Sequence, residues 1–189
     1  SNPYDGARLP GTVGFALPGV DVRIRGGQPG VIEVKGPNVF KGYWRMPEKT
    51  KEEFTEDGWF ITGDVGTIDQ EGRVTIVGRA KDLIISGGFN VYPKEIEEVL
   101  DAMPGVTESA VIGLPHPDFG EGVAAVVTAS GPLPPEAEII ASLAARLAKF
   151  KVPKRIFLVN ELPRNAMGKV QKAELRRIYA DALSGAKTS

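Results

Sequence analysis

The sequence predicts an α+β protein in two parts, a β-rich first part and a second part in which helices and strands alternate. Sixteen of the 23 glycines fall within residues 1–90, a distribution typical of short strands joined by turns. After about residue 80, apolar residues recur at helical spacing between strand-like segments. We therefore expect a barrel-like or meander β-subdomain over residues 1–80 and a small α+β domain over residues 81–189.

The first part contains two predicted hairpins and one short helix. Val20–Ile24 and Val31–Lys35 alternate in polarity around a Gly-Gly-Gln-Pro-Gly turn. Val65–Ile68 and Val74–Val77 flank an Asp-Gln-Glu-Gly turn in the same way. A helix is expected over residues 47–52, because proline is favoured at the first helical position.

The second part is predicted to hold three helices and three strands. The strands are expected at residues 106–114, 122–128 and 155–159, and the first helix begins at Pro93. We expect residues 185–189 to fray. The apolar positions that mark the three helices are Ile96, Val99, Leu100 and Met103, then Ile139, Ile140, Leu143 and Leu147, and finally Leu175, Ile178, Tyr179 and Ala182.

Composition excludes several classes of protein. The absence of cysteine excludes disulfides, thiolate metal sites and a cysteine nucleophile, and a single histidine, His116, argues against a histidine metal site or relay. We therefore predict no metal site in this chain. No apolar run approaches the ~20 residues that span a bilayer, and no leader precedes the first strand. The net charge of −1 gives no reason to expect nucleic acid, so we expect a cytoplasmic protein without membrane or nucleic-acid partners.

Charge is segregated within the second part. Residues 82–138 hold ten acidic side chains and one basic side chain, whereas residues 146–177 hold ten basic and two acidic. One interpretation is a pair of solvated faces that attract each other. The other is a basic surface for a polyphosphate or a carboxylate. Both interpretations stay open on composition.

Three segments carry groups suited to nucleotide or acyl chemistry. Asp64 ends an apolar strand in Thr-Gly-Asp, where a carboxylate can bind a ribose diol or simply cap a turn. Arg79 precedes the pair Gly87-Gly88, which allows a close backbone approach to a ligand but also suits a plain turn. Lys169 follows a glycine in a predicted loop of the basic segment, where it is either a mobile cation for a transition state or an ordinary surface lysine.

Taken together and in order, these segments resemble the adenylate-forming superfamily of acyl-CoA synthetases, luciferases and peptide-synthetase adenylation domains. Residues 1–6 and 36–50 are most similar to malonyl-CoA synthetases. The segments that carry the superfamily resemblance are Gly30–Tyr43, Trp59–Asp64, Gly78–Asp82 with Gly87 and Glu95–Glu97, and Pro163–Lys169 with Leu175-Arg176.

The resemblance implies a role for each candidate residue. Asp64 and Arg79 would bind the ribose of ATP and of the acyl-adenylate, and Lys81 would be the hinge of a small mobile domain. Lys169 would act between the substrate carboxylate and the α-phosphate, and acetylation of this lysine by an acetyltransferase would switch it off. The loop with Gly87, Gly88 and Phe89 would line the pantetheine tunnel for CoA.

The resemblance also implies a reaction and a partner. A carboxylic acid, ATP with its Mg²⁺, and CoA would give acyl-CoA, AMP and pyrophosphate, with malonate or methylmalonate as the expected acid. Residues 1–80 would be the last β-rich part of a larger N-terminal domain that holds most of the acyl pocket. The alternatives are a ligase for a fatty or aryl acid and a non-catalytic binding module.

Overall fold

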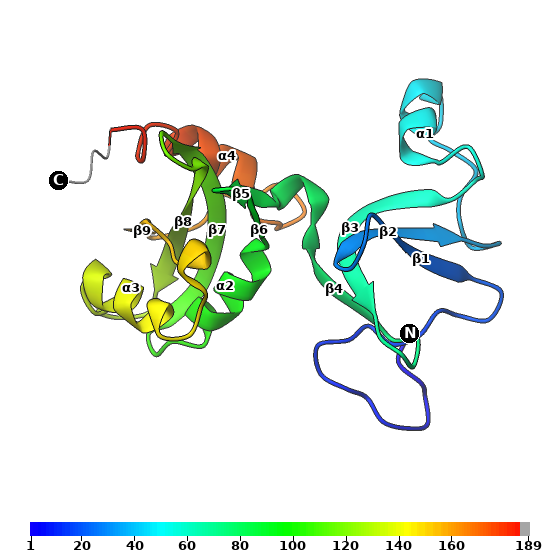
Figure 1. Ribbon diagram of the computed structural model, residues 1–189, viewed down its shortest axis with the longest axis horizontal. Helices are drawn as coiled ribbons and strands as arrows, with labels where there is room; N and C mark the ends of the chain where they lie inside the picture. The colour runs from blue at the N-terminus through cyan, green and yellow to red at the C-terminus, as the bar shows by residue number, and fades with distance from the viewer. Residues whose placement is uncertain (186–189) are drawn as a thin grey trace. The chain divides into compact units, whose positions relative to one another are not determined.

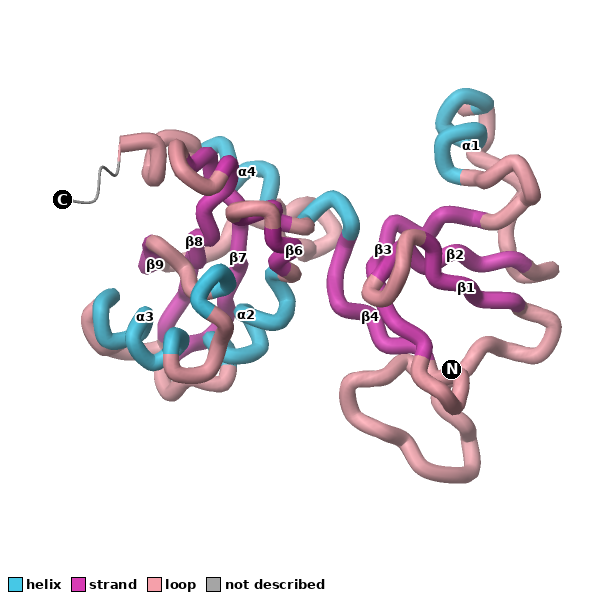
Figure 2. The backbone as a smooth tube through the Cα atoms, viewed as in Figure 1, coloured by secondary structure: helices cyan, strands magenta, loops and turns pink. Residues whose placement is uncertain are grey.

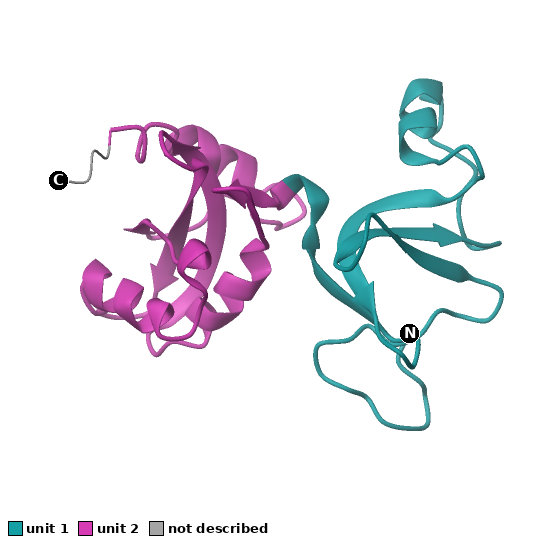
Figure 3. Ribbon diagram, viewed as in Figure 1, with its two compact units in different colours: residues 1–81 teal, residues 82–189 magenta. Residues whose placement is uncertain are grey.

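The α+β class is confirmed by the computed structural model, which describes residues 1–185. The chain divides into two units, residues 1–81 and residues 82–189 (Figure 3). The division falls one residue after the boundary expected from the sequence. Most of the segment expected to fray, residues 186–189, lies outside the described residues.

Unit 1 is built on an antiparallel meander of four strands (Figure 1). Neighbouring strands follow chain order from β1 to β4, and helix α1 (Pro47–Glu53) lies in the β2–β3 connection. In the described part of the chain β1 and β4 are not paired with each other, so the sheet is an open meander and not a closed barrel. The strands are β1 (Asp21–Arg25), β2 (Gly30–Lys35), β3 (Phe60–Ile68) and β4 (Val74–Arg79).

A fully buried carboxylate, that of Glu33, ties the sheet to the loop before β3. Arg23 Nε donates to Glu33 Oε2 at 2.6 Å, and Arg25 Nε lies 2.8 Å from Oε1. Arg23 also binds Asp57, with its Nη1 2.9 Å from Oδ2, and stacks over the ring of Trp59. The hydrogen bond from Arg23, aided by the hydroxyl of Thr55, lowers the pKa of Asp57 to about 2.

Unit 2 is a mixed sheet covered by helices on both faces. The strand order is β6-β5-β8-β7, and β9 pairs in parallel with β8. The strands are β5 (Ile84–Ser86), β6 (Phe89–Val91), β7 (Val106–His116), β8 (Gly120–Ala129) and β9 (Arg155–Leu158). The helices are α2 (Pro93–Asp101), α3 (Glu136–Ala144) and α4 (Lys172–Ile178), with short 3₁₀ turns η1 (Ala80–Asp82) at the unit boundary and η2 (Lys149–Lys151) before β9.

Alternation along β7 and β8 produces two separate cores, because successive side chains of a strand point to opposite faces. One face packs on α2 and α3, the other on α4, and Figure 2 shows α4 apart from the other two helices. The first core contains Val111, Val123, Ala125 and Val127 with Ile96, Leu100, Ile139 and Leu143; the second contains Ala110, Ile112, Leu114, Ala124 and Val126 with Leu162, Leu175 and Leu183.

Two predicted helices are shorter than the apolar spacing suggests. Helix α3 ends at Ala144 and α4 at Ile178, so Leu147, Tyr179 and Ala182 lie beyond the helices. These side chains still pack on the cores, and Tyr179 stacks on Phe157 with ring centroids 4.0 Å apart. Apolar spacing therefore identified most of the residues that pack on the cores and overestimated helix length. It was wrong for Ile178, which is exposed, and for Ile140, which lines an open pocket and belongs to neither core.

The acidic and basic segments of unit 2 bind each other. Five ion pairs join them, which confirms the interpretation of two attracting faces and leaves fewer cations free for a ligand. The pairs are Glu95–Lys151, Glu136–Arg155, Glu108–Arg164, Glu97–Lys172 and Asp82–Arg176. Separately, none of the helices within residues 1–185 combines the length and apolar character needed to cross a membrane.

Candidate functional site

Asp64 and Arg79 meet on neighbouring strands of unit 1. They are register partners on β3 and β4, and Arg79 Nη1 donates to Asp64 Oδ1 at 2.6 Å. A quarter of the Asp64 side chain is exposed, and its Oδ2 has no partner among the residues that the structure describes. The pair therefore presents one free carboxylate oxygen and a half-exposed guanidinium side by side.

The backbone around Asp64 is fixed by Thr62. Its hydroxyl donates to the carbonyl of Ile32 on β2 at 2.9 Å and accepts from the amide of Asp64 at 3.1 Å. Gly63 between them has φ of +71°, a conformation that glycine adopts without strain. Each residue of the Thr-Gly-Asp motif thus contributes to where the carboxylate lies.

Lys81 is exposed and is the last residue of unit 1. It lies in η1, and the next residue, Asp82, accepts a hydrogen bond from Arg176 of α4 at 3.1 Å. Asp82, the first residue of unit 2, is therefore anchored to α4, and Lys81 is the residue just before this anchor.

Gly87 and Gly88 form the tight turn between β5 and β6. Their φ angles are +57° and +82°, and the amide of Gly87 donates to the carbonyl of Phe119 at 2.9 Å. A Cβ on Gly87 would lie 3.3 Å from the ring of Phe119, whereas a Cβ on Gly88 would meet no atom of residues 1–185 within 4 Å. Gly87 is thus packed at the β7–β8 turn, and Gly88 lies in open space.

A cavity of about 370 Å³ adjoins this turn. Gly87 and Phe89 line it, and Phe89 stacks on Phe150 with ring centroids 4.6 Å apart. Gly88, which the resemblance places in the same wall, is not among the lining residues. The full lining is Ser86, Gly87, Phe89, Phe119, Lys149, Phe150 and Lys154.

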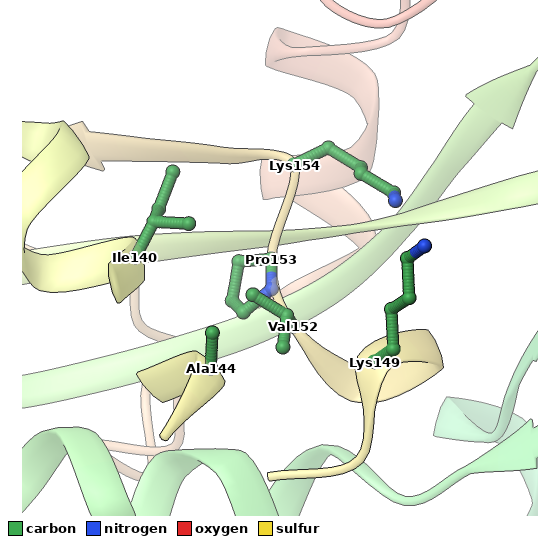
Figure 4. Close-up of a pocket in the computed structure, with 6 residues that line it drawn as sticks. All are labelled: Ile140, Ala144, Lys149, Val152, Pro153 and Lys154. Carbon is green, nitrogen blue, oxygen red and sulfur yellow. The ribbon is translucent and has the colours of Figure 1, made fainter. Parts of the chain in front are cut away.

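Lys149 and Lys154 also line an open pocket of about 530 Å³ beside α3 (Figure 4). In that view both side chains extend to the same side of Pro153, and Ile140, which also lines the pocket, lies on the other side. Lys154 Nζ lies 4.9 Å from the ring centroid of Phe119, and Lys149 has no ion-pair partner among the described residues. Two cations of the basic segment therefore remain available to an anion.

Lys169 lies on an exposed loop that leads into α4. Asn165 Oδ1 accepts hydrogen bonds from the amides of Met167 and Lys169, each at 3.0 Å. The Lys169 ammonium has no partner among residues 1–185. The loop backbone is thus ordered by its own side chains, while the charged end of Lys169 is free.

The structure brings some predicted residues together and adds others. Asp64 and Arg79 are in contact, and Gly87 and Phe89 share a cavity. Sequence reasoning missed Phe119 and Phe150, since an isolated aromatic residue is usually a core residue. It also missed Asn165, although an asparagine close before a Gly-Lys turn is a recognised signal for a side-chain-stabilised turn.

Comparison with known proteins relates this geometry to a family. A family model described as the AMP-binding enzyme C-terminal domain matches residues 95–169, a span that includes β7 and β8 and ends on Lys169. Residues 95–169 belong to this family, the C-terminal domain of the AMP-binding enzymes. Lys169 is thus the last residue of the matched domain, and Asp64 and Arg79 lie before its start.

Individual members of the superfamily are similar over nearly the whole chain but are much longer. A 3-[(3aS,4S,7aS)-7a-methyl-1,5-dioxo-octahydro-1H-inden-4-yl]propanoyl:CoA ligase of Rhodococcus jostii is 51% identical over 87% of this chain and 32% of its own length. A malonate–CoA ligase of Arabidopsis thaliana is 43% identical over 94% and 32%. The chain therefore spans about a third of the length of the curated relatives that it matches.

MatB from Rhodopseudomonas palustris is similar in both sequence and structure. Its ATP-bound crystal structure is 61% identical with a TM-score of 0.89, covering 96% of this chain and 38% of that one. Its apo structure is 62% identical over the same shares, with a TM-score of 0.65.

Proposed function

We propose that this chain supplies the C-terminal portion of an AMP-forming acid–thiol ligase. In the first step a carboxylate oxygen of the acid attacks the α-phosphorus of ATP, and the bond to pyrophosphate breaks. In the second step the thiolate of CoA attacks the acyl carbonyl, and AMP leaves. Mg²⁺ enters with ATP as part of the substrate, and the larger N-terminal portion holds most of the acyl pocket.

The free ammonium of Lys169 carries this proposal. A carboxylate and a triphosphate repel each other, and negative charge builds further as the two approach. A cation placed between them stabilises the transition state more than the ground state, because the charge it meets is largest there. Lys169 has the required free charge on an ordered loop, at the end of the domain that the family model matches.

The Asp64–Arg79 pair is suited to the ribose of the nucleotide. The free Oδ2 of Asp64 is an acceptor for a hydroxyl, and the guanidinium beside it donates to ribose or phosphate oxygens. Because Arg79 holds the other oxygen at 2.6 Å, the carboxylate is oriented before a ligand binds.

The cavity beside Gly87 is suited to CoA. Its aromatic wall accommodates an uncharged chain, and Lys149 and Lys154 place positive charge at its edge for phosphate groups. Gly87 and Phe89 line this space, whereas Gly88 contributes by allowing the turn that presents them.

Two segments of unit 2 contact opposite ends of the β7–β8 hairpin. They are the loop that carries Lys169, called the lysine loop, and the turn Gly87-Gly88, called the glycine turn. The lysine loop binds Glu108 near the start of β7 through Arg164, and the glycine turn binds Phe119 after its end. Glu108 and His116 are eight residues apart on β7, a rise of roughly 26 Å at ~3.3 Å per residue. This separation supports a cycle in which each loop serves one step.

Rotation of the small domain about Lys81 would alternate the two loops. The anchored Asp82 beside it supports this assignment, since motion would concentrate at the last residue before the anchor. The comparison with MatB adds support, because one chain matches its ATP-bound and apo structures with TM-scores of 0.89 and 0.65. The two MatB structures therefore differ from each other over the matched region.

For the acid we propose malonate or methylmalonate. The similarity to the Arabidopsis malonate–CoA ligase supports this choice. The Rhodococcus ligase, whose name specifies a bicyclic propanoate, is at least as similar in sequence, so a ligase for another acid is the second candidate. An acetyltransferase acting on the exposed Lys169, and a cytoplasmic location, remain predictions from the resemblance.

The test is a fusion of this chain to the N-terminal portion of Rhodopseudomonas MatB, replacing the segment that it matches. Pyrophosphate release is measured with ATP and malonate or methylmalonate, and because the MatB portion supplies most of the acyl pocket, the assay tests the role of Lys169. We expect release that Lys169→Ala lowers by ~10²–10³-fold. Lys51→Ala, which removes an exposed lysine of α1, is the matched control and should leave the rate unchanged.

Two results would contradict the proposal. If the Lys169→Ala fusion released pyrophosphate as fast as the wild-type fusion, Lys169 would have no role in adenylation. A wild-type fusion that neither releases pyrophosphate nor binds ATP or CoA by calorimetry would favour a non-catalytic module.

A further inference from the structure

The loop that carries Lys169 is closed at its base by backbone hydrogen bonds. Arg164 and Val170 form an isolated antiparallel bridge, and the amide of Gln171 donates to the carbonyl of Pro163 at 2.8 Å. Within the loop the amide of Asn165 donates to the carbonyl of Lys169 at 3.0 Å. The peptide of Lys169 is therefore held where the loop returns on itself.

The side-chain oxygen of Asn165 links two backbone amides of the loop. Its Oδ1 binds the amides of Met167 and Lys169, and its own carbonyl accepts from the amide of Gly168 at 2.9 Å. An Asx turn of this kind lets one side-chain acceptor orient two nearby backbone donors. The amide of Lys169 is thus bound directly by a side chain.

Arg164 connects the loop to the body of unit 2. Its Nη1 donates to the carbonyl of Gly168 at 2.7 Å, and its Nη2 donates to the carboxylate of Glu108 on β7. Glu108 lies on the strand whose next residues, from Ser109 to Leu114, are buried. The guanidinium is therefore a brace between a rigid strand and the peptide just before Lys169.

We propose that Arg164, Asn165 and Glu108 are positioning residues that set the place of the Lys169 ammonium for adenylation. The inference rests on the proposed function of Lys169 and assigns these residues no contact with substrate. Five hydrogen bonds converge on the backbone of residues 165–169, while the lysine Nζ has no partner among the described residues. Such an arrangement fixes the base of a long side chain and leaves its charge free, which reduces the ordering cost in the transition state.

The contact between Arg164 and Glu108 makes it possible to distinguish two roles for Arg164. It is either a brace that positions the loop or a second cation that binds substrate. If Arg164 bound phosphate itself, removal of Glu108 would free its charge and leave adenylation unchanged or faster. If Arg164 acts as a brace, removal of Glu108 must weaken adenylation in the same direction as removal of Arg164, because either change breaks the link from β7 to Gly168.

Hydrogen exchange on this chain tests the positioning without reference to activity. We expect faster exchange of the Met167 and Lys169 amides in Asn165→Leu, which has a similar shape but no acceptor, by ~10-fold. Asn165→Asp keeps the acceptor and should retain the protection. Unchanged exchange in Asn165→Leu would overturn the role of Asn165.

Adenylation by the MatB fusion tests the catalytic consequence. Arg164→Ala and Glu108→Ala should each lower kcat for pyrophosphate release by ~10–100-fold, because a small misplacement of a catalytic group is costly. Both should leave the reaction of supplied acyl-adenylate with CoA within about twofold. Arg177→Ala, which breaks another exposed ion pair of unit 2, is the control expected to change neither step.

The outcomes distinguish this inference from the proposed function. If Lys169→Ala abolishes adenylation but Arg164→Ala and Glu108→Ala do not affect it, the positioning role is wrong and the function stands. If Glu108→Ala accelerates adenylation while Arg164→Ala slows it, Arg164 binds substrate. If Lys169→Ala has no effect, the proposed function itself fails, and hydrogen exchange still decides whether the brace orders the loop.

Discussion

Arg79 Nη1 lies 2.6 Å from Asp64 Oδ1, across two adjacent antiparallel strands whose register places the two residues opposite each other. The contact occupies one carboxylate oxygen, and the other has no partner among the residues that the structure describes. A surface ion pair of this exposure adds little to stability, so its main consequence is orientation of the carboxylate.

Replacing Asp64 by asparagine should weaken nucleotide binding. The variant keeps the size of the side chain but loses the charged acceptor, and a hydrogen bond to a charged group corresponds to about 10-fold or more in affinity. We expect the KM for ATP of the fusion to rise by ~10-fold in Asp64→Asn. Asp69→Asn, in the turn between β3 and β4, is the control, and equal effects of the two variants would contradict a specific role.

A methyl group on Gly87 should slow the second step and spare the first. Alanine is strained at φ +57°, and its Cβ would lie 3.3 Å from the ring of Phe119 at the cavity. We expect Gly87→Ala to reduce thioester formation from supplied acyl-adenylate by ~10-fold, given misplacement of the turn.

Gly72 provides a matched control for backbone strain. Its φ is +85°, and a Cβ there would meet no atom of the described part of the chain within 4 Å. Gly72→Ala therefore carries a comparable conformational penalty away from the cavity. If it slowed thioester formation as much as Gly87→Ala, general destabilisation would explain both.

If the small domain rotates about Lys81 as proposed, restricting the backbone there should slow the half-reaction that depends on this rotation. Proline fixes φ near −65°, which is compatible with η1 but limits other conformations. We expect Lys81→Pro to slow one half-reaction by at least ~10-fold relative to the other. Lys81→Ala keeps rotational freedom and should leave both rates near wild type. Equal slowing of both half-reactions by Lys81→Pro would argue against a hinge.

Acid should remove the contribution of Asp57 to the stability of unit 1. The pKa of Asp57 is lowered from 3.8 to about 2, chiefly by the hydrogen bond from Arg23. A lowered folded-state pKa stabilises the fold above pH 3.8, and this contribution is lost as the pH falls toward 2. The destabilisation caused by Asp57→Asn should therefore be present at pH 5 and disappear near pH 2.

Tryptophan fluorescence measures this effect in unit 1 alone, since Trp44 and Trp59 are the only tryptophans and both lie there. Denaturant titrations of wild type and Asp57→Asn between pH 5 and pH 2 give the two stability curves. A difference that stays constant with pH would contradict the assignment of the low pKa.

Local patterns in the sequence determine much of this fold. The apolar residues at 110–114 and 123–127 predicted two strands. In the structure, successive side chains of these strands lie alternately in the two cores. Helix ends were less predictable, because Leu147 and Tyr179 keep helical spacing while packing from turns. Spacing records which side chains face the core, and backbone hydrogen bonds decide where the helix stops.

The candidate site was only partly predictable for a related reason. Asp64, Arg79 and Lys169 lie in short motifs whose order along the chain resembles that of the adenylate-forming superfamily. The partners of Lys169 depend on contacts between distant residues, such as Glu108 and Arg164, which are 56 positions apart. Charge segregation indicated that the two segments attract, but not which pair would brace the lysine loop.

The most direct test of the central claim compares the two half-reactions of the MatB fusion with and without Lys169. Pyrophosphate release from ATP and acid is measured first, and thioester formation from supplied acyl-adenylate and CoA second. Lys169→Ala is expected to lower the first rate by ~10²–10³-fold and to leave the second within about twofold. A variant that loses both rates equally, or neither, would contradict the assignment of Lys169 to adenylation.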